Sequence, residues 1–210
     1  MDHKNSWKDS LDIFNKQLEL NKSQLLLDPA SSEYPGHWKN FCSLLSQGLS
    51  LISIKKVLDI GCGCGVCSEL LHRHFPYLEY TGMDYSERAI ELAKKTWNRT
   101  FLVKNLWNIQ PEDVKDYDLI HSDALLEVLP NGDKALKQLL SLKVSTILLN
   151  RVKNGSDTNH FSTYKAYDIL PTYSFYHNRS ELLSCFSDFG YAHLEINNDP
   201  YSTFFMWRKS

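Results

Sequence analysis

Short apolar runs and amphipathic stretches alternate along the chain from residue 55 onward. The apolar runs, bounded by glycine or polar residues, predict buried strands at 57–60, 78–83, 101–103, 117–120 and 146–149. Apolar residues three or four positions apart predict helices at 66–75, after Ser86, around 135–140 and at 182–189, where Gly190 ends the last helix. Because strands and helices alternate closely, we expect a mostly parallel sheet with helices on both faces.

Both ends of the chain depart from this alternation. Two C-terminal strands, at 191–196 and 202–207, are separated only by the turn residues of 197–200, so we expect them to pair antiparallel. Two helices are expected around 8–27 and 37–50, and the pattern leaves open whether they cap the sheet or pack on its edge. We therefore expect one α/β domain at 51–210, preceded by an N-terminal helical cap at 1–50 that is not an independent domain.

The composition is that of a globular chain without a large charge excess. Of the 210 residues, 42% are hydrophobic and 23% are charged, and the net formal charge is −2. Electrostatic binding of nucleic acid needs clustered Lys and Arg, so we expect no nucleic-acid partner. No apolar run approaches the roughly 20 residues that cross a bilayer, and the N-terminus is polar, so we expect a cytoplasmic protein without a membrane partner.

The five cysteines are odd in number, and three of them lie close together. This is a poor framework for disulfides, so we expect reduced thiols. The C-x-C-x-x-C spacing of Cys62, Cys64 and Cys67 resembles half of a zinc site, with His72 and His74 nearby. A glycine loop of this kind cannot also close a tetrahedral metal site. We therefore expect small packing residues here and no metal.

The segment VLDIGCGCG, residues 57–65, carries the most specific chemical signal. Gly61, Gly63 and Gly65 follow a strand and open a helix, so a ligand can approach the backbone closely. The spacing does not match the G-x-G-x-x-G pattern of dinucleotide sites, because Val66 stands at its last position. Asp59, two residues before the first glycine, would repel a pyrophosphate but suits an ammonium or sulfonium group. The loop therefore favours S-adenosylmethionine over NAD.

This segment resembles motif I of the class I S-adenosylmethionine-dependent methyltransferases. The similarity extends to Asp84, an acid at the end of the second strand, and to SDALLEVLPNGDKAL at 122–136. Within that stretch Glu127 is kept, whereas Val128 stands where the family usually has His. Residues 149–191 are loosely similar to methyltransferases encoded among polysaccharide-biosynthesis genes. The resemblance implies a doubly wound, Rossmann-like fold with seven strands, mostly parallel, and an antiparallel C-terminal strand.

The resemblance also assigns a cofactor site. The three glycines are expected to line the methionine moiety, and Asp59 to orient its amino group. Asp84 is expected to accept from the ribose hydroxyls, the alternative being that it only caps the following helix. Tyr85 is expected to stack on adenine, and Asn105 to accept from the adenine amino group. The full set of expected cofactor residues is Asp59, Gly61, Cys62, Gly63, Gly65, Asp84, Tyr85, Asn105, Leu106 and Ser122.

Two histidines are candidate catalytic bases. His121 follows the fourth strand and is either a base beside the sulfonium or a structural histidine of the core. His160 lies within residues 151–177, a segment rich in aromatic residues. That segment is either a lid that binds the methyl acceptor or a loop pinned to the edge of the sheet. The acceptor-binding candidates are Tyr164, Tyr167, Tyr176 and His177.

The sequence predicts an S-adenosylmethionine-dependent methyltransferase that releases S-adenosylhomocysteine. The chain lacks the Asp-Pro-Pro-Tyr and Asn-Pro-Pro-Tyr signatures of base-amine methylation and the Pro-Cys nucleophile of carbon-5 methylation. We therefore expect transfer to an O or N atom of a small-molecule or sugar acceptor. The alternatives are another S-adenosylmethionine-using transferase, such as an aminopropyl transferase, or a non-catalytic regulator that binds the cofactor. The identity of the acceptor and the oligomeric state do not follow from the residues.

Overall fold

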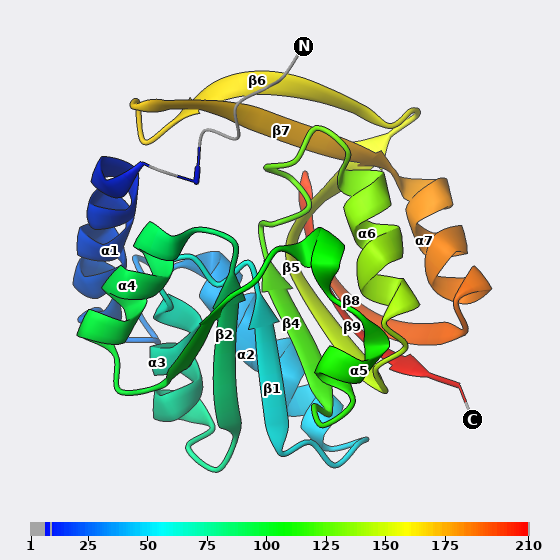
Figure 1. Cartoon of the computed structure of the whole chain (residues 1–210). Helices are drawn as coiled ribbons and strands as arrows, with labels where there is room; N and C mark the ends of the chain where they lie inside the picture. Colours follow the sequence, from blue (N-terminus) through cyan, green and yellow to red (C-terminus); the bar gives the residue numbers. More distant parts are fainter. Residues whose placement is uncertain (1–6, 9, 210) are drawn as a thin grey trace.

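The protein is built around a twisted, mostly parallel sheet, described for residues 7–8 and 10–209 in a computed structural model (Figure 1). Five parallel strands lie in the order β3-β2-β1-β4-β5. Strand β9 pairs antiparallel with β5, and β8 pairs antiparallel with β9. The strands are β1 (Lys56–Ile60), β2 (Glu79–Asp84), β3 (Thr100–Val103), β4 (Leu119–Asp123), β5 (Thr146–Ser156), β8 (Tyr191–Asn198) and β9 (Tyr201–Arg208). The predicted mostly parallel sheet with its antiparallel C-terminal strands is confirmed, but the predicted count of seven strands is too low. Among the described residues the sheet has nine strands, because β7 (Leu170–Asn178) pairs parallel with the end of β5, and β6 (His160–Ala166) pairs with β7.

Helices cover both faces of this sheet, and a separate apolar core forms under each layer. One core packs the sheet against α2 (Gly36–Leu49), α3 (Val66–His74) and α4 (Glu87–Thr96). The other packs it against α5 (Pro111–Val114), α6 (Gly132–Ser141) and α7 (Arg179–Asp188), with the 3₁₀ turn η1 (Leu106–Asn108) beside them. Leu58 of β1 faces the second core, whereas its neighbour Val57 faces the first. Burial of both strand faces explains the continuous apolar runs.

Residues 151–177 hold two strands that the sequence pattern did not predict. Strand β5 continues past Leu149 to Ser156, and the chain then forms an antiparallel ribbon of β6 (His160–Ala166) and β7 (Leu170–Asn178). The ribbon crosses above the carboxyl ends of the parallel strands (Figure 1). Aromatic pairs stabilise it, as where Phe161 meets Tyr173 edge-on at 5.3 Å between ring centroids.

The two N-terminal helices have different places in the fold. Helix α2 belongs to one helical layer, and its Gly48 lies so close to Phe205 of β9 that a Cβ atom would sit 2.1 Å from the ring. Helix α1 (Leu11–Leu25) lies instead beside α4 and reaches the ribbon (Figure 1). Its Lys16 Nζ donates to the Tyr167 carbonyl at 2.9 Å. Of the two helices, α1 is therefore the one that contacts the ribbon.

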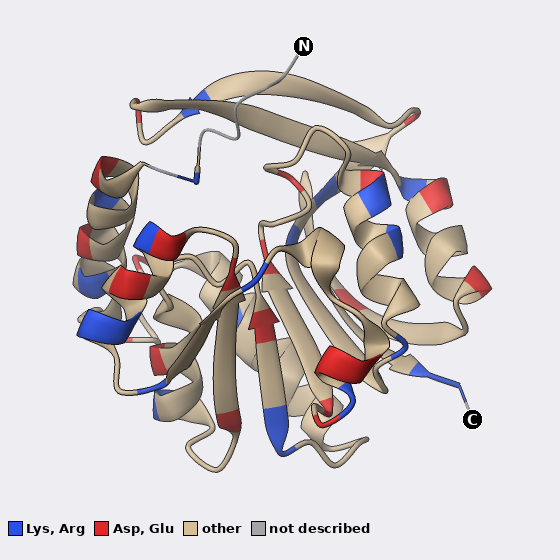
Figure 2. Ribbon diagram, viewed as in Figure 1, with Lys and Arg blue, Asp and Glu red and all other residues tan. Residues whose placement is uncertain are grey.

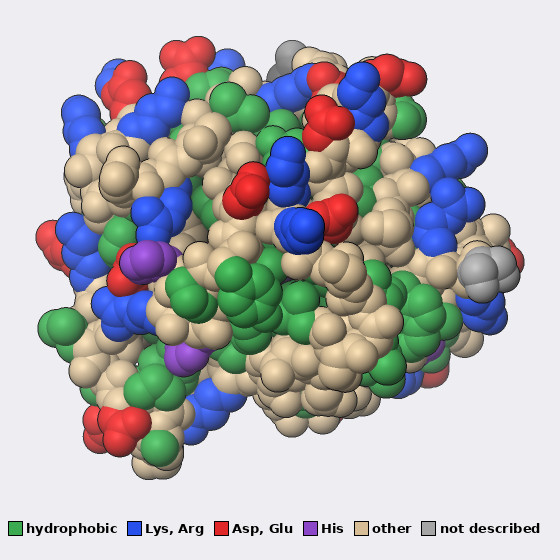
Figure 3. Space-filling view, turned by 90° about the horizontal axis from the view of Figure 1, so that it is seen from below, with side chains coloured by type: hydrophobic (Ala, Val, Ile, Leu, Met, Phe, Trp, Pro, Cys, Tyr) green, Lys and Arg blue, Asp and Glu red, His purple; other side chains and the backbone are tan. Residues whose placement is uncertain are grey.

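Charge is distributed without a single basic stripe. Basic and acidic residues are interspersed over the helices and strands (Figure 2). The face opposite the ribbon also mixes basic, acidic and apolar side chains (Figure 3). Within the described residues, no helix has the length and apolar character that a membrane span requires.

Candidate active site

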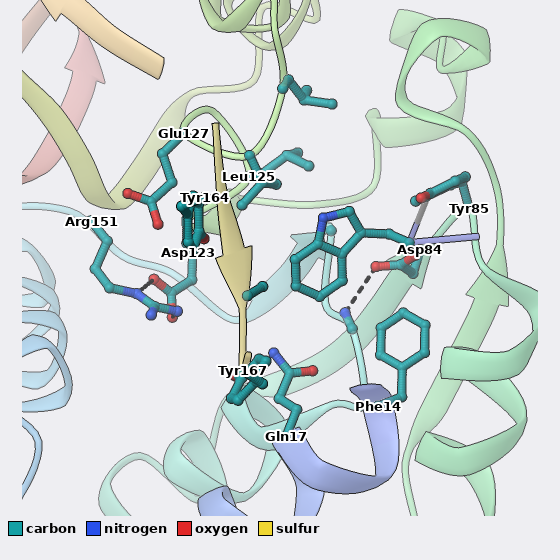
Figure 4. Close-up of a pocket in the computed structure, with 17 residues that line it drawn as sticks. Phe14, Gln17, Asp84, Tyr85, Asp123, Leu125, Glu127, Arg151, Tyr164 and Tyr167 are labelled. Atoms are coloured by element: carbon teal, nitrogen blue, oxygen red, sulfur yellow. Dashed lines mark hydrogen bonds and ion pairs between the residues drawn. The ribbon is translucent and has the colours of Figure 1, made fainter. Parts of the chain in front are cut away.

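A cavity of about 260 Å³ opens at the carboxyl ends of the strands, beneath the ribbon (Figure 4). This is the edge at which open α/β sheets bind their ligands. The walls come from the N-terminal segment and α1, the loop after β1, the end of β2, the β4–α6 loop, β5, β6 and the turn that follows β6. The lining residues are Trp7, Phe14, Gln17, Gly61, Gly63, Asp84, Tyr85, Asp123, Ala124, Leu125, Glu127, Val128, Leu129, Arg151, Tyr164, Ala166 and Tyr167.

The glycine loop presents bare backbone to this cavity. Gly61 and Gly63 line it with φ angles of +79° and +54°, a conformation that side chains rarely adopt. A Cβ atom at Gly61 would lie 3.1 Å from Leu125 Cδ1, and one at Gly63 would lie 3.2 Å from Gln17 Oε1. Added side chains would therefore fill the space in which a ligand can touch the loop.

Asp84 closes the opposite side of the loop. Its Oδ2 accepts from the Gly63 N–H at 2.9 Å, and its Oδ1 accepts from the Ser86 N–H at 2.9 Å. Burial raises the pKa of Asp84 to about 6, although hydrogen bonds from the Ser86 and Gly63 N–H groups oppose the shift. The Tyr85 N–H also hydrogen-bonds to the carboxylate. Because a carboxylate offers about four acceptor positions, one remains for a hydroxyl of a ligand. Asp84 thus bonds the glycine loop as well as the residue that caps α4.

Asp59 lies beneath the loop and outside the cavity lining. It is 2% exposed, its Oδ2 accepts from the Tyr80 hydroxyl at 2.8 Å, and its Oδ1 lies 2.7 Å from His121 Nδ1. The His121 ring in turn packs edge-on against Phe41 at 4.7 Å between ring centroids. Both side chains thus lie in a buried polar network, and neither of them lines the cavity.

Asp59, Cys67 and His121 also form the one group, among the described residues, whose ligand atoms are close enough to share a metal ion. Cys62 and Cys64 do not belong to it, so the C-x-C-x-x-C sequence does not converge on one point. The short Asp59–His121 contact and the 3.5 Å approach of Cys67 Sγ to His121 Nδ1 explain the cluster as hydrogen bonding.

The remaining expected cofactor residues divide into two groups. Tyr85 lines the cavity beside Asp84 (Figure 4), whereas the other five lie outside its lining. Ser122 donates to the Ile60 carbonyl at 2.9 Å, and Asn105 Oδ1 accepts from the Trp107 N–H at 3.0 Å, capping the 3₁₀ turn. The other three, packed against neighbouring core residues, are Cys62, Gly65 and Leu106.

Of the expected acceptor residues, Tyr164 and Tyr167 reach the cavity. The Tyr176 ring lies 5.1 Å from Lys153 Nζ instead. His160 is exposed, with its ring stacked on Tyr176 at 5.1 Å. His177 is 2% exposed and borders a separate groove between α6 and α7. The ribbon thus covers the cavity with tyrosines, and neither of its histidines faces the cavity.

Sequence reasoning missed an ion pair in the cavity wall. Arg151 Nε donates to Asp123 Oδ1 at 2.7 Å, and Arg151 Nη2 donates to Oδ2 at 3.0 Å. Burial raises the pKa of Asp123, but the guanidinium outweighs burial and lowers it to about 2. Arg151 has a φ of 54° where the β5–β9 register shifts, an irregularity that re-aims side chains near sites. No residue pattern in the sequence indicates that Arg151 adopts a positive φ.

The N-terminal segment contributes the other residues that were missed. Phe14 and Gln17 of α1 line the cavity, and Gln17 Oε1 accepts from Cys64 Sγ at 3.4 Å. The Trp7 Nε1–H donates to Thr172 Oγ1 of the ribbon at 2.8 Å. The helical pattern indicated an N-terminal helix but not the partners it would find far along the chain.

Known proteins resemble the chain most clearly around this site. A family described as "Methyltransferase domain" matches residues 57–143. Trans-aconitate 2-methyltransferase of Escherichia coli O1:K1 / APEC is 35% identical over 95 residues, which are 45% of this chain and 37% of that protein. Malonyl-[acyl-carrier protein] O-methyltransferase of Bacillus cereus is 31% identical over 111 residues, 51% of this chain and 40% of the relative. The chain thus matches about two fifths of the length of these relatives.

Solved structures resemble this protein over its whole length. The structure described as the "DhpI-SAM-HEP complex" superposes with a TM-score of 0.65 and 14% identity, covering 100% of both chains. At this identity the match concerns the fold alone.

Proposed function

Because the chain belongs to the class I S-adenosylmethionine-dependent methyltransferase superfamily, we propose that it transfers a methyl group from S-adenosylmethionine to an acceptor. The acceptor is an O or N atom of a small molecule or sugar. The observation that carries the proposal is one cavity that Gly61, Gly63 and Asp84 line together with Tyr164 and Tyr167. The relatives' names give trans-aconitate and malonyl-[acyl-carrier protein] as their substrates, so small acids are among the acceptors to test.

The residues of the cavity fit the cofactor. The backbone of Gly61 and Gly63 gives room for the methionine part, and the Asp84 carboxylate keeps an acceptor position for the ribose hydroxyls. Tyr85 offers an aromatic face to the adenine ring. When bound, the cofactor supplies an activated methyl group on a sulfonium with a good leaving group. What the protein adds is alignment of the acceptor and exclusion of water.

The affinity for the cofactor should depend on pH because Asp84 titrates. Its pKa is about 6, so the carboxylate is ionised above that pH and protonated below it. The protonated form has lost acceptor capacity for the ribose, so affinity should fall by up to roughly tenfold per pH unit below about 6 and level off above it. Calorimetry with S-adenosylhomocysteine between pH 5 and 8 measures this. The Asp84→Asn variant should bind weakly with a flat profile, and an equal slope in that variant would contradict the assignment.

Product analysis tests the proposed reaction. The protein is incubated with methyl-labelled S-adenosylmethionine and pooled alcohols, carboxylic acids and amines, and the nucleoside product is identified by mass. We expect S-adenosylhomocysteine and a labelled acceptor. Methylthioadenosine as the product would indicate an aminopropyl-type transferase instead. Tight cofactor binding with neither product would indicate a non-catalytic regulator.

The tyrosines of the ribbon should affect the acceptor and not the cofactor. Tyr164 lines the cavity from β6, where its flat ring suits a sugar or aromatic acceptor. The Tyr164→Ala variant should raise the acceptor KM at least about tenfold, a loss of roughly 1.4 kcal/mol, with S-adenosylhomocysteine affinity within about threefold. His160→Ala is the matched control from the same strand, because His160 stacks on Tyr176 outside the cavity. Equal effects of both variants would mean that the ribbon acts only as a scaffold.

A further inference from the structure

Glu127 is a buried acid in the acceptor cavity with an unused oxygen. It comes from the loop between β4 and α6, it is 7% exposed, and it lines the cavity (Figure 4). Among the described residues its Oε2 has no hydrogen-bond partner. Its backbone carbonyl accepts from the Phe175 N–H of the ribbon at 2.7 Å, which fixes the loop against β7. Buried polar atoms are nearly always hydrogen-bonded, so an unpartnered buried oxygen on a residue that lines a cavity points to a ligand.

The other acids of the cavity are already bonded. Both oxygens of Asp123 accept from Arg151, and both oxygens of Asp84 accept from backbone N–H groups. No histidine is found among the described residues that line the cavity. Among the described acids that line the cavity, Glu127 is therefore the one with an oxygen, Oε2, that accepts no hydrogen bond.

The surroundings of Glu127 select against charged acceptors. Lys153 Nζ lies 3.9 Å from Glu127 Oε2 and donates to Ser174 Oγ at 2.5 Å. Three tyrosine rings surround this ammonium, with centroids 5.1 to 6.0 Å away, namely Tyr164, Tyr176 and Tyr201. Glu127 and Lys153 together carry no net charge, so neither an ammonium nor a carboxylate of an acceptor would find an uncompensated opposite charge beside this pair. Lys153 also already occupies the place between the tyrosine rings in which an acceptor ammonium could bind. A neutral acceptor needs no such charge.

Resting on the proposed function, we propose that Glu127 is the general base for a neutral hydroxyl acceptor, such as an alcohol, a phenol or a sugar. The acceptor oxygen forms a bond to the methyl carbon while the carbon–sulfur bond breaks and its electron pair returns to sulfur. The hydroxyl proton moves to Glu127 Oε2. The products are a methyl ether, a neutral thioether and a protonated Glu127, so atoms and charge balance.

Burial and the charges around the cavity make Glu127 a stronger base than a glutamate in water. Burial raises its pKa and Asp123 adds to the shift, whereas Lys153, Arg151 and Tyr201 lower the pKa. A raised pKa lies closer to neutral pH, where a general base is most effective.

The first test is a titration that needs no acceptor. In the complex with S-adenosylhomocysteine, the Glu127 side-chain carbon is followed by NMR in protein with labelled glutamate, and Glu127→Gln assigns the signal. We expect a pKa above the ordinary value of 4.5. Changing Lys153 to Met should raise that pKa further, because the nearest cation is removed. A pKa at or below 4.5 would overturn the proposal, since it would show a carboxylate held in a tight ion pair.

The second test is the chemistry of the methylated product. Labelled S-adenosylmethionine is offered with three pools: phenol, glycerol and D-fucose; trans-aconitate and malonate; benzylamine and cadaverine. We expect label only in the first pool, as an ether that survives mild base. A base-labile ester or a methylated amine would overturn this inference while leaving the proposed function intact. Label in no pool would contradict the proposed function and this inference with it.

Variants then connect the acceptor to the residue. With the hydroxyl acceptor, Glu127→Gln should lower kcat by about 100-fold or more and remove the acidic limb of its pH profile. S-adenosylhomocysteine affinity should stay within about threefold. Glu112→Gln, at an exposed glutamate of α5, is the matched control and should behave like the unmodified protein. An unchanged kcat in Glu127→Gln would assign proton removal to solvent and overturn the proposal.

Discussion

Replacing Asp84 with alanine should weaken the binding of S-adenosylhomocysteine by roughly 10- to 100-fold. The substitution removes a charged acceptor for the ribose hydroxyls, and such hydrogen bonds contribute about 1.5–3 kcal/mol. It also removes the 2.9 Å bond by which the Gly63 N–H is held, so the glycine loop loses its anchor at the same time. Calorimetry on the folded variant measures the loss.

A matched control separates binding from folding. Asp113 accepts from the Gln110 N–H at 2.8 Å in the first turn of α5, and it does not line the cavity. Asp113→Ala therefore removes a comparable bond to a helix start and should leave the affinity unchanged. If Asp84→Ala binds S-adenosylhomocysteine as tightly as Asp113→Ala does, the Asp84 carboxylate does not contact the ligand and only caps the start of α4.

A valine in place of Gly63 should reduce cofactor affinity by roughly 5- to 30-fold through backbone strain, and further by filling the cavity. The φ of +54° costs an ordinary side chain about 1–2 kcal/mol, and more for a β-branched one. We expect the loop of the variant to shift out of this conformation to relieve the strain, so that ligand binding must restore it. The Cβ atom would also lie 3.2 Å from Gln17 Oε1, which must move.

Gly190 provides the control for this strain. Its φ is +80°, and nothing lies within 4 Å of the position of an added Cβ atom, at the end of α7. Gly190→Val should therefore destabilise the fold by a similar amount without changing the affinity for S-adenosylhomocysteine. A thermal melt and a titration of both variants give the two quantities. Equal affinities would mean that the ligand does not touch the loop at Gly63.

The sheet and its cofactor edge could be predicted because their signals are local in sequence. A parallel strand buried on both faces needs a continuous apolar run, as at Val57 and Leu58, and a ligand-binding turn after it needs glycine, as at Gly61. Ser86 begins α4 as predicted, with its hydroxyl accepting from the Ala89 N–H at 3.3 Å. Each of these features depends on residues a few positions apart.

The chemistry inside the cavity depends on pairs that are distant in sequence. Asp59 meets His121, and Asp123 meets Arg151, only after the strands have found their register. Asp59 was therefore expected to contact a ligand, whereas its oxygens bond Tyr80 and His121 and the residue lies outside the cavity lining. The ribbon was missed because β6 is exposed along most of its length, whereas the buried positions of β7 include the polar residues Thr172, Ser174 and His177. Neither strand therefore shows a period of apolar residues.

The central claim is that this cavity is built for S-adenosylmethionine and not for a dinucleotide. A calorimetric titration of the unmodified protein at pH 7.5 with S-adenosylhomocysteine, and separately with NAD, tests it directly. The account predicts one saturable site per chain for S-adenosylhomocysteine and no binding of NAD. At 100 times the dissociation constant, the same ligand should stabilise the fold by about 2.7 kcal/mol. Saturable binding of NAD, or no binding of S-adenosylhomocysteine, would contradict the account.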